Sequence, residues 1–226
     1  MSHAHIRGIT AAVLAAIAGA GCASQGTMQT APAPAKGGPA ESSAIAQAHA
    51  DSIRHPYTAA DVKFMQGMIG HHGQAIVMAG WAPTHDASPS LQTLASRIIN
   101  SQQDEIATMQ HWLADRRQTV PDPHAPMTMM MNGVQQEMLM PGMLTKDQMA
   151  QLDHAKGDEF DRLFLTFMIQ HHRGAVSMVH DLFESQGAAQ DELVFKFASD
   201  VNVDQTTEIA RMERMLAIET LGSGSP

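Results

Sequence analysis

Two copies of one stretch decide the fold: FMQGMIGHHGQAIVMA at Phe64–Ala79 and FLTFMIQHHRGAVSMV at Phe164–Val179, one hundred positions apart. Unrelated segments of this length share about one identity at ordinary residue frequencies. The match therefore indicates an internal duplication. Each copy carries a tandem histidine between two methionines. The shared residues are Phe64 and Phe164, Met68 and Met168, Ile69 and Ile169, His71 and His171, His72 and His172, Ala75 and Ala175, and Met78 and Met178.

A second duplicated segment follows each copy, because residues 95–113 align with residues 198–216. The repeated residues follow the three–four spacing of one helix face. One repeat is therefore a helical hairpin. Two hairpins that bury their apolar faces against each other make an all-α four-helix bundle with one long crossover. The repeated face comprises Gln102, Glu105, Ile106, Met109 and Leu113 in the first copy.

Capping signals set the expected helix bounds within a bundle domain at residues 57–221. Thr58 and Asp61 have capping-box spacing, and Ser88 followed by Pro89 is a cap with proline at the first helical position. A short helix is expected at residues 145–156, after the cap at Thr145. The long helices are expected at about residues 58–81, 88–116, 158–185 and 190–221.

The N-terminal region is typical of an exported protein. Residues 1–22 contain a weakly basic start and an apolar run, Ile9–Ala20, which is too short to span a bilayer. Cys22 follows Gly-Ala-Gly, which resembles a lipobox, and cleavage after Ala20 is the alternative. We expect a periplasmic or outer-envelope location, either lipid-anchored through Cys22 or freely soluble. Residues 23–56 are expected to be a disordered tether and residues 222–226 a disordered tail.

The composition narrows the chemistry. The chain has 226 residues with 18 methionines and 13 histidines, and its net charge of -9 argues against a nucleic-acid partner. Its one cysteine excludes internal disulfides and thiolate metal cages. Thioethers and imidazoles suit copper, above all Cu(I), whereas zinc usually brings cysteines or carboxylates. Because ligation requires neutral imidazole, binding should weaken as the pH falls through the ordinary histidine range.

Each of these features has a structural alternative. A histidine of a tandem pair can be a satisfied, half-buried residue, and a methionine in a helix can simply fill the core. Glu105 and Glu208, being repeated, either orient a histidine by accepting its second N–H or are exposed helix charges. The crossover, about residues 118–157, either captures metal or forms a hydrophobic lid. Its methionines are Met127, Met129, Met130, Met131, Met138, Met140, Met143 and Met149.

The motifs MIGHHGQAIVM at Met68–Met78 and MIQHHRGAVSM at Met168–Met178 resemble the twin motif of the domain-of-unknown-function 305 family. The segments from Leu144 and from Glu159 resemble that family's linker, so the resemblance covers roughly residues 57–219. It implies a ferritin-like four-helix bundle, usually exported, and some members, of the CopM type, are periplasmic copper-binding resistance proteins. The metal ligands it implies are Met68, His71, His72, Met78, Met168, His171, His172 and Met178; helix geometry adds Met109 and Met212.

Three functions follow as hypotheses. The first is a non-enzymatic protein that buffers, sequesters or hands on copper, as Cu(I) or alternatively Cu(II), with no protein partner assigned. The second is a di-metal oxidase, but that chemistry uses Glu-x-x-His, and here Glu105 precedes Thr108 and Glu208 precedes Arg211 at that spacing. The third is a structural or interaction module that uses its methionine-rich segment to bind a partner without metal.

Overall fold

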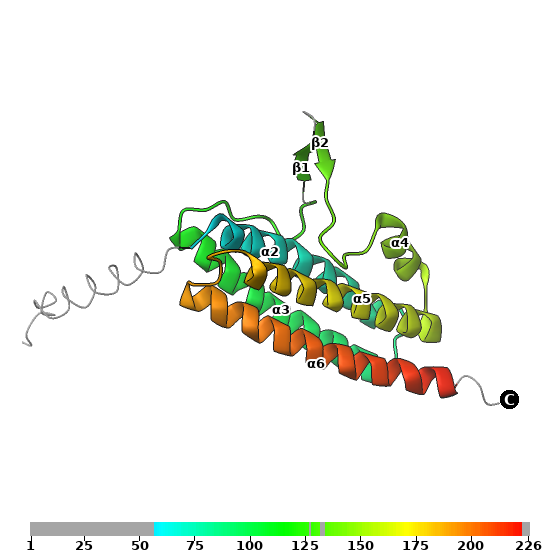
Figure 1. Ribbon diagram of the computed structural model, residues 1–226. Coiled ribbons are helices and arrows are strands. Elements are labelled where there is room, and N and C mark those ends of the chain that lie inside the picture. Colours follow the sequence, from blue (N-terminus) through cyan, green and yellow to red (C-terminus); the bar gives the residue numbers. More distant parts are fainter. Residues whose placement is uncertain (1–56, 127, 132–133, 223–226) are drawn as a thin grey trace, which may run out of the picture. The chain divides into compact units, whose positions relative to one another are not determined.

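A computed structural model describes residues 57–126, 128–131 and 134–222. Four long α-helices run side by side (Figure 1), which confirms the all-α bundle. In chain order, the described elements are α2 (Ala59–Gly80), the 3-10 turn η1 (Ala82–Thr84), α3 (Pro89–Asp115), β1 (Thr128–Met131), β2 (Val134–Glu137), α4 (Lys146–His154), α5 (Gly157–Glu184) and α6 (Glu192–Gly222).

The helices begin at the caps that the sequence predicts. Thr58 and Asp61 form a complete capping box before α2, and Thr145 forms another with Gln148 before α4. The Ser88 hydroxyl accepts the backbone N–H of Leu91 at the start of α3. These side chains satisfy backbone donors that have no partner within the helix, so each cap fixes where its helix starts.

The bundle is two hairpins packed face to face. Helix α2 packs on α3, α5 packs on α6, and the hairpins meet through α2 and α5. Large apolar side chains such as Trp112, Phe160 and Phe164 are fully buried between them. Burial of one such side chain stabilises the fold by about 1.5–3 kcal/mol.

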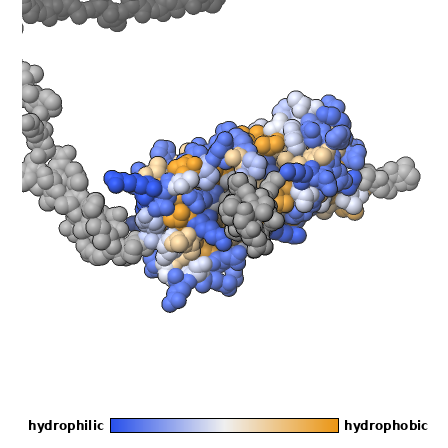
Figure 2. Space-filling model, turned by 90° about the horizontal axis from the view of Figure 1, so that it is seen from above, coloured by the Kyte–Doolittle hydropathy of each residue, from blue (hydrophilic) through white to orange (hydrophobic). Residues whose placement is uncertain are grey.

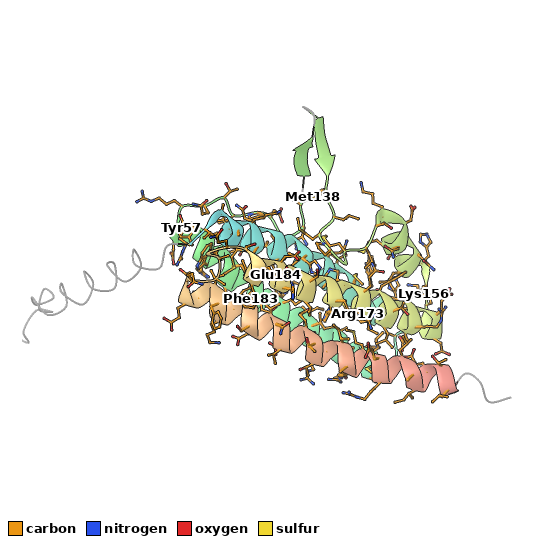
Figure 3. The ribbon with its side chains drawn as sticks, viewed as in Figure 1. Tyr57, Met138, Lys156, Arg173, Phe183 and Glu184 are labelled. Carbon is orange, nitrogen blue, oxygen red and sulfur yellow. The ribbon has the colours of Figure 1, made fainter. Side chains whose placement is uncertain are left out.

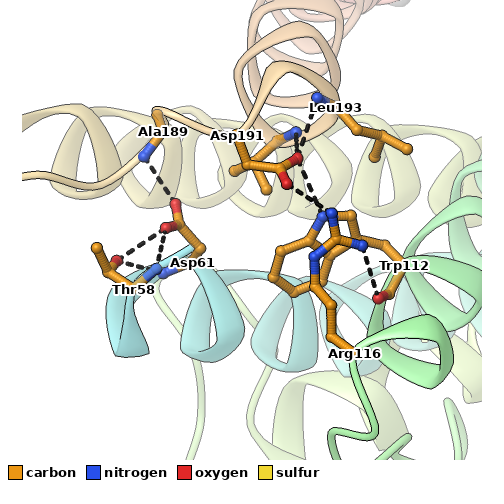
Figure 4. A network of polar contacts seen from close by, with 8 residues as sticks. Thr58, Asp61, Trp112, Arg116, Ala189, Asp191 and Leu193 are labelled. Atoms are coloured by element: carbon orange, nitrogen blue, oxygen red, sulfur yellow. Dashed lines mark hydrogen bonds and ion pairs between the residues drawn. The ribbon is translucent and has the colours of Figure 1, made fainter. Parts of the chain in front are cut away.

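Two buried aspartates tie the hairpins together reciprocally. Asp61 of α2 accepts the backbone N–H of Ala189, in the loop before α6, at 2.7 Å (Figure 4). Asp161 of α5 accepts the backbone N–H of Ser88, in the loop before α3, at 3.1 Å. The carboxylate of each hairpin thus fixes the loop of the other. A hydrogen bond to a charged group contributes roughly 1.5–3 kcal/mol.

A third connection, which Figure 4 draws beside the Asp61 contact, joins α3 to the start of α6. Asp191 accepts a hydrogen bond from the Trp112 indole at 3.1 Å and pairs with Arg116 at 2.5 Å. Its carboxylate also accepts the backbone N–H of Leu193 and so caps α6. This network holds α3 and α6 together at the end where α6 begins.

Residues 117–145, between α3 and α4, form a segment that we call the strap. It contains the antiparallel hairpin β1–β2, which the helical reading of the sequence did not predict. The strap lies against α2 and α5 at two glycines. A Cβ on Gly73 would lie 1.9 Å from the carbonyl oxygen of Pro123, and a Cβ on Gly174 would lie 1.9 Å from that of Pro141. Only glycine permits this approach of backbone to helix.

The strap is anchored further by polar contacts and by methionines. The Gln74 amide donates to the Leu144 carbonyl at 3.0 Å and accepts its N–H at 2.7 Å. Met140 of the strap is buried, and Met138 and Met143 pack against the core, as the lid alternative predicts; Met149 of α4 packs there as well. Met138 lies where the strap reaches the helices (Figure 3). The face shown in Figure 2 carries separate apolar patches rather than one continuous patch.

The predicted export signal, Cys22 and the tether lie outside the described residues, as does the tail beyond residue 222. The side chains of the methionines at positions 127 and 129–131 also lie outside them. Among the described helices, none has the length and apolar character needed to cross a membrane.

Candidate metal centre

The α2–α5 interface brings together the first histidine of each tandem pair. The ring centroids of His71 and His171 lie 3.8 Å apart, with the ring planes tilted by 42°. Both side chains are fully buried. The structure therefore excludes the half-buried alternative for these residues and places two imidazoles, from positions one hundred residues apart, in direct contact.

The strap determines the hydrogen-bonding state of His71. Its Nε2 lies 2.9 Å from the carbonyl oxygen of Pro141. Because a carbonyl only accepts, we assign the proton to Nε2, and the lone pair of the neutral ring then resides on Nδ1. Nδ1 of His71 and both ring nitrogens of His171 have no hydrogen-bond partner. The pair thus offers unpaired nitrogen atoms in a buried place.

Both rings of this pair are neutral at ordinary pH. Burial, together with nearby His72, lowers the pKa of His71 to about 3. Burial, together with His71, lowers the pKa of His171 well below its usual value. The cause is the high cost of placing charge in an apolar interior. The sequence alone predicts that protons displace a metal within the ordinary pH range of histidine. For these two nitrogens, displacement would therefore occur at a lower pH than that.

The second histidine of each pair faces a glutamate of the neighbouring helix. Nε2 of His72 lies 2.6 Å from Oε2 of Glu105 on α3, and Nε2 of His172 lies 2.7 Å from Oε2 of Glu208 on α6. The second contact is a hydrogen bond, whereas the first is close but lacks hydrogen-bond angles. Both glutamates are partly buried, at 15% and 23% exposure. They are therefore not the exposed helix charges of the alternative reading.

Helix geometry explains why the adjacent histidines have different partners. Successive residues on a helix are about 100° apart, and the ring centroids of His71 and His72 are separated by 6.3 Å. The spacing is the same for His171 and His172. The inner pair therefore meets at the α2–α5 interface, while the other two histidines point towards α3 and α6.

The six methionines of the predicted ligand set are all buried, but they fall into two separate apolar clusters. Each cluster combines methionines from both hairpins. One contains Met68, Met109 and Met178, and the other contains Met78, Met168 and Met212. All of them pack as core residues, so a role as ligands beside the histidines stays a prediction.

The described residues include one other group with metal-binding composition. His180, Asp181 and Glu184 each offer a ligand atom within 4.8 Å of the others, and all three are exposed. They lie within one turn near the end of α5. Nothing in the sequence distinguishes these three residues, and exposed acidic groups of this kind are common without a metal.

Sequence reasoning also missed residues that position the centre. Asp61 and Asp161 are one hundred positions apart, as the histidines are, so the same offset could have identified them. Gln102 and Gln205 were recognised as repeated but given no role. Both are buried, and the Oε1 atoms of both lack partners. The role of Pro141 could not be predicted, because no feature of the sequence indicates that its carbonyl contacts a histidine.

A bundle built from two helical hairpins, with buried histidines at their interface and methionines in the core, defines the class of this protein. The domain of unknown function DUF305 matches residues 61–216, and the chain belongs to that family. A DUF305 protein from Streptomyces coelicolor, inferred to be secreted, is 28% identical in its crystal structure. The match covers 71% of this chain and 94% of that one, with a TM-score of 0.60.

The structure is also similar to that of CopM in its Cu(I)-bound form. The identity is 28%, over 71% of this chain and 96% of that chain, with a TM-score of 0.53. CopM has also been solved with Cu(II) and with silver. Uncharacterized protein L153 of Acanthamoeba polyphaga mimivirus is 40% identical over 57 residues, which are 25% of this chain and 38% of that protein. The match thus spans well under half of that relative.

Proposed function

We propose that this protein binds copper, chiefly as Cu(I), and that it buffers, sequesters or hands on the ion outside the cytoplasm. The observation that carries the proposal is the buried contact between His71 and His171, whose neutral rings hold unpartnered nitrogen atoms. A buried polar atom without a partner costs about 1–3 kcal/mol. A bound metal ion would remove that cost.

The donor set fits copper. Neutral imidazole binds both oxidation states, and thioethers favour Cu(I). Metal–nitrogen bonds are about 2 Å long, so nitrogens on opposite sides of one ion lie roughly 4 Å apart. Two rings that ligate one ion from opposite sides have centroids roughly 6 Å apart, so the His71 and His171 rings, at 3.8 Å, would separate or turn to admit the ion. Glu105 and Glu208 would orient His72 and His172, since a carboxylate that accepts the second N–H makes imidazole a better ligand.

Similarity to CopM supports the choice of metal, because copper and silver are bound to that protein. The location follows from two further observations. The N-terminal residues have the pattern of an export signal, and the Streptomyces relative is inferred to be secreted. Anchoring of the protein to a membrane through a lipid on Cys22 is part of this proposal.

We further propose that the protein is not an enzyme. Glu-x-x-His is absent from the repeated α3 and α6 segments, and His72 and His172 each meet a single carboxylate, Glu105 and Glu208. Oxygen uptake on addition of Fe(II) to the purified protein would contradict this part of the proposal.

A competition titration with Cu(I) tests the proposal. The double variant His71→Gln/His171→Gln should weaken binding by more than about 100-fold, because loss of a ligand exceeds the 10–100-fold effect of losing a supporting residue. The variant with alanine at positions 71, 72, 171 and 172 should abolish tight binding. His85→Gln is the matched control, since His85 is also buried but contacts Asp153 far from the pair. Parental affinity in a folded quadruple variant would overturn the proposal.

A further inference from the structure

An acidic groove of 370 Å³ separates α3 from α6 on the side of the bundle opposite the strap. Its carboxylates come from both helices, and its one cation, Lys196, is paired with Asp200. The polar residues that line it are Asp104, Glu105, Thr108, Lys196, Asp200 and Asp204. The groove therefore carries a net negative charge. Apolar side chains could have filled this position between the two hairpins.

The carboxylates in this groove crowd one another. Burial, followed by the charges of Glu105, Glu208 and Asp200, raises the pKa of Asp204. A carboxyl group whose proton is retained by neighbouring anions lies in a negative potential. The same potential attracts cations from solution.

The inner end of the groove meets a buried histidine. Glu105 lines the groove, and its Oε2 lies 2.6 Å from Nε2 of His72. His72 is fully buried, and neither of its ring nitrogens has a hydrogen-bond partner. The adjacent residue on α2 is His71, at 6.3 Å between ring centroids. An imidazole that faces Glu105 through Nε2, and whose Nδ1 has no partner, thus stands between the acidic groove and the His71–His171 pair.

The other side of the pair is covered by backbone. Pro141 accepts the hydrogen bond of His71 and lies directly on Gly174, while Pro123 lies on Gly73. An ion approaching through the strap would have to displace these contacts. An ion approaching between α3 and α6 meets carboxylates first and then a histidine.

We propose that the groove between α3 and α6 is the path by which a metal cation reaches His72 and, through it, the His71–His171 pair. This inference rests on the proposed function and adds to it a direction of approach. The carboxylates of the groove attract the hydrated cation by charge, and their oxygens replace its water ligands before imidazole binds. Steering of this kind raises association rates by 10- to 1,000-fold and weakens as ionic strength increases.

Stopped-flow mixing of the protein with Cu(II) sulfate measures the rate at which copper loads, with quenching of tryptophan fluorescence as the signal. Only the phase that disappears in His71→Gln/His171→Gln is counted. The groove variant is Asp104→Asn/Asp200→Asn/Asp204→Asn, and Thr108→Lys is a second variant that keeps every carboxylate. The matched control, Asp86→Asn/Asp115→Asn/Glu159→Gln, removes three exposed carboxylates elsewhere and changes the net charge equally.

At low salt, the groove variant should load about tenfold more slowly than the parent, at the low end of the steering effect. Thr108→Lys should also slow loading, whereas the control should stay within about twofold of the parent. The dependence of the rate on salt should flatten in the groove variant alone. Equal loading rates in the parent, the groove variant and Thr108→Lys would overturn the path and leave the proposed function intact. Absence of any copper binding by the parent at equilibrium would overturn both.

Discussion

The two hairpins share a frame but differ where the strap crosses them. Both carry an aspartate that fixes the partner's loop, and both pair a buried histidine with a glutamate. Beneath the strap, however, the two copies differ in sequence: Gly73 of α2 aligns with Arg173 of α5, and Gln74 aligns with Gly174. The duplicated helices set the symmetric part of the centre, and the single strap breaks that symmetry.

This asymmetry has a chemical consequence for the histidine pair. Nε2 of His71 donates to the strap, which leaves only Nδ1 for another partner. His171 makes no hydrogen bond to the strap, and neither of its ring nitrogens has a partner with hydrogen-bond angles, although the backbone of His71 lies close enough to act on its pKa. His71 and His171 are equivalent in the repeat but unequal as ligands, because the Pro141 carbonyl orients His71 and no strap carbonyl does the same for His171.

The largest effect should come from acidifying the metal-free protein. The pKa values of His71 and His171 are lower in the folded state than in the unfolded state, so the unfolded state binds more protons below about pH 6.5. Stability should therefore be fully present above pH 6.5 and fall as the pH drops towards about 3. The slope follows the number of protons that the unfolded state binds and the folded state does not.

Urea denaturation at pH 7.0, 5.5 and 4.5 measures this loss. The double variant His71→Gln/His171→Gln should show a shallower dependence of the free energy of unfolding on pH, even if its stability at pH 7 is lower. The same slope in the parent and the double variant would show that the buried pair does not stay neutral.

Substitution of the two helix glycines that the strap covers, Gly73 and Gly174, should give the next largest effect. Alanine at Gly174 would place its Cβ 1.9 Å from the Pro141 oxygen, and the clash at Gly73 with Pro123 is equally close. Overpacking of this kind lowers the free energy of unfolding by about 1–3 kcal/mol. Gly80→Ala is the control, because a Cβ on Gly80 meets nothing within 4 Å.

The two glycine variants also separate the strap's roles. Gly174→Ala should disturb the Pro141 contact of His71, seen as a changed tautomer signal in the ¹⁵N spectrum of the histidine rings. Gly73→Ala should leave that signal unchanged, because its contact is with Pro123. If both variants were as stable as Gly80→Ala, the close approach of the strap would be refuted.

Substitution of the glutamates tests the symmetric part of the centre. Glu105→Gln and Glu208→Gln should each weaken Cu(I) binding by about tenfold, the lower end of the range for residues that support a ligand. The effect of Glu208→Gln should be at least as large as that of Glu105→Gln, because Glu208 makes a hydrogen bond to His172, whereas Glu105 lies close to His72 without hydrogen-bond angles. A competition titration measures both, and a large effect of one with no effect of the other would show that the repeats do not contribute equally.

The smallest effect is expected on the exposed side of α5. Arg173 pairs with Glu213 at 2.7 Å, but both side chains are about half exposed or more. Arg173→Ala should change the free energy of unfolding by less than about 1 kcal/mol, as is usual for a surface ion pair. Thermal unfolding measures the difference. A shift as large as that of Gly174→Ala would mean that this position also holds the strap.

The sequence predicted the features that depend on local pattern or on the repeat. Helical spacing and the caps at Thr58, Ser88 and Thr145 located the helices, and the offset of one hundred located the histidines. Glu105 and Glu208 were identified as candidate partners of histidines because they recur on one helix face. All of these arguments use positions within one helix or between two copies of it.

The strap could not be predicted in this way, because it occurs once and follows no period. Its contact with Gly174 depends on where the chain passes after leaving the β1–β2 hairpin, and the tautomer of His71 depends in turn on that path. The separation of the methionines into two clusters was also unpredictable. Thioethers at helical spacing fill a core and bind a metal equally well, so their spacing does not show which of them face one another.

Anomalous diffraction from crystals grown with Ag(I), a mimic of Cu(I), locates the bound ion relative to the buried histidines. If the His71–His171 pair binds the metal, a peak lies at bonding distance from Nδ1 of His71 and from one ring nitrogen of His171. Peaks confined to exposed methionines or to the His180–Glu184 turn, with the His71–His171 contact unchanged, would contradict it.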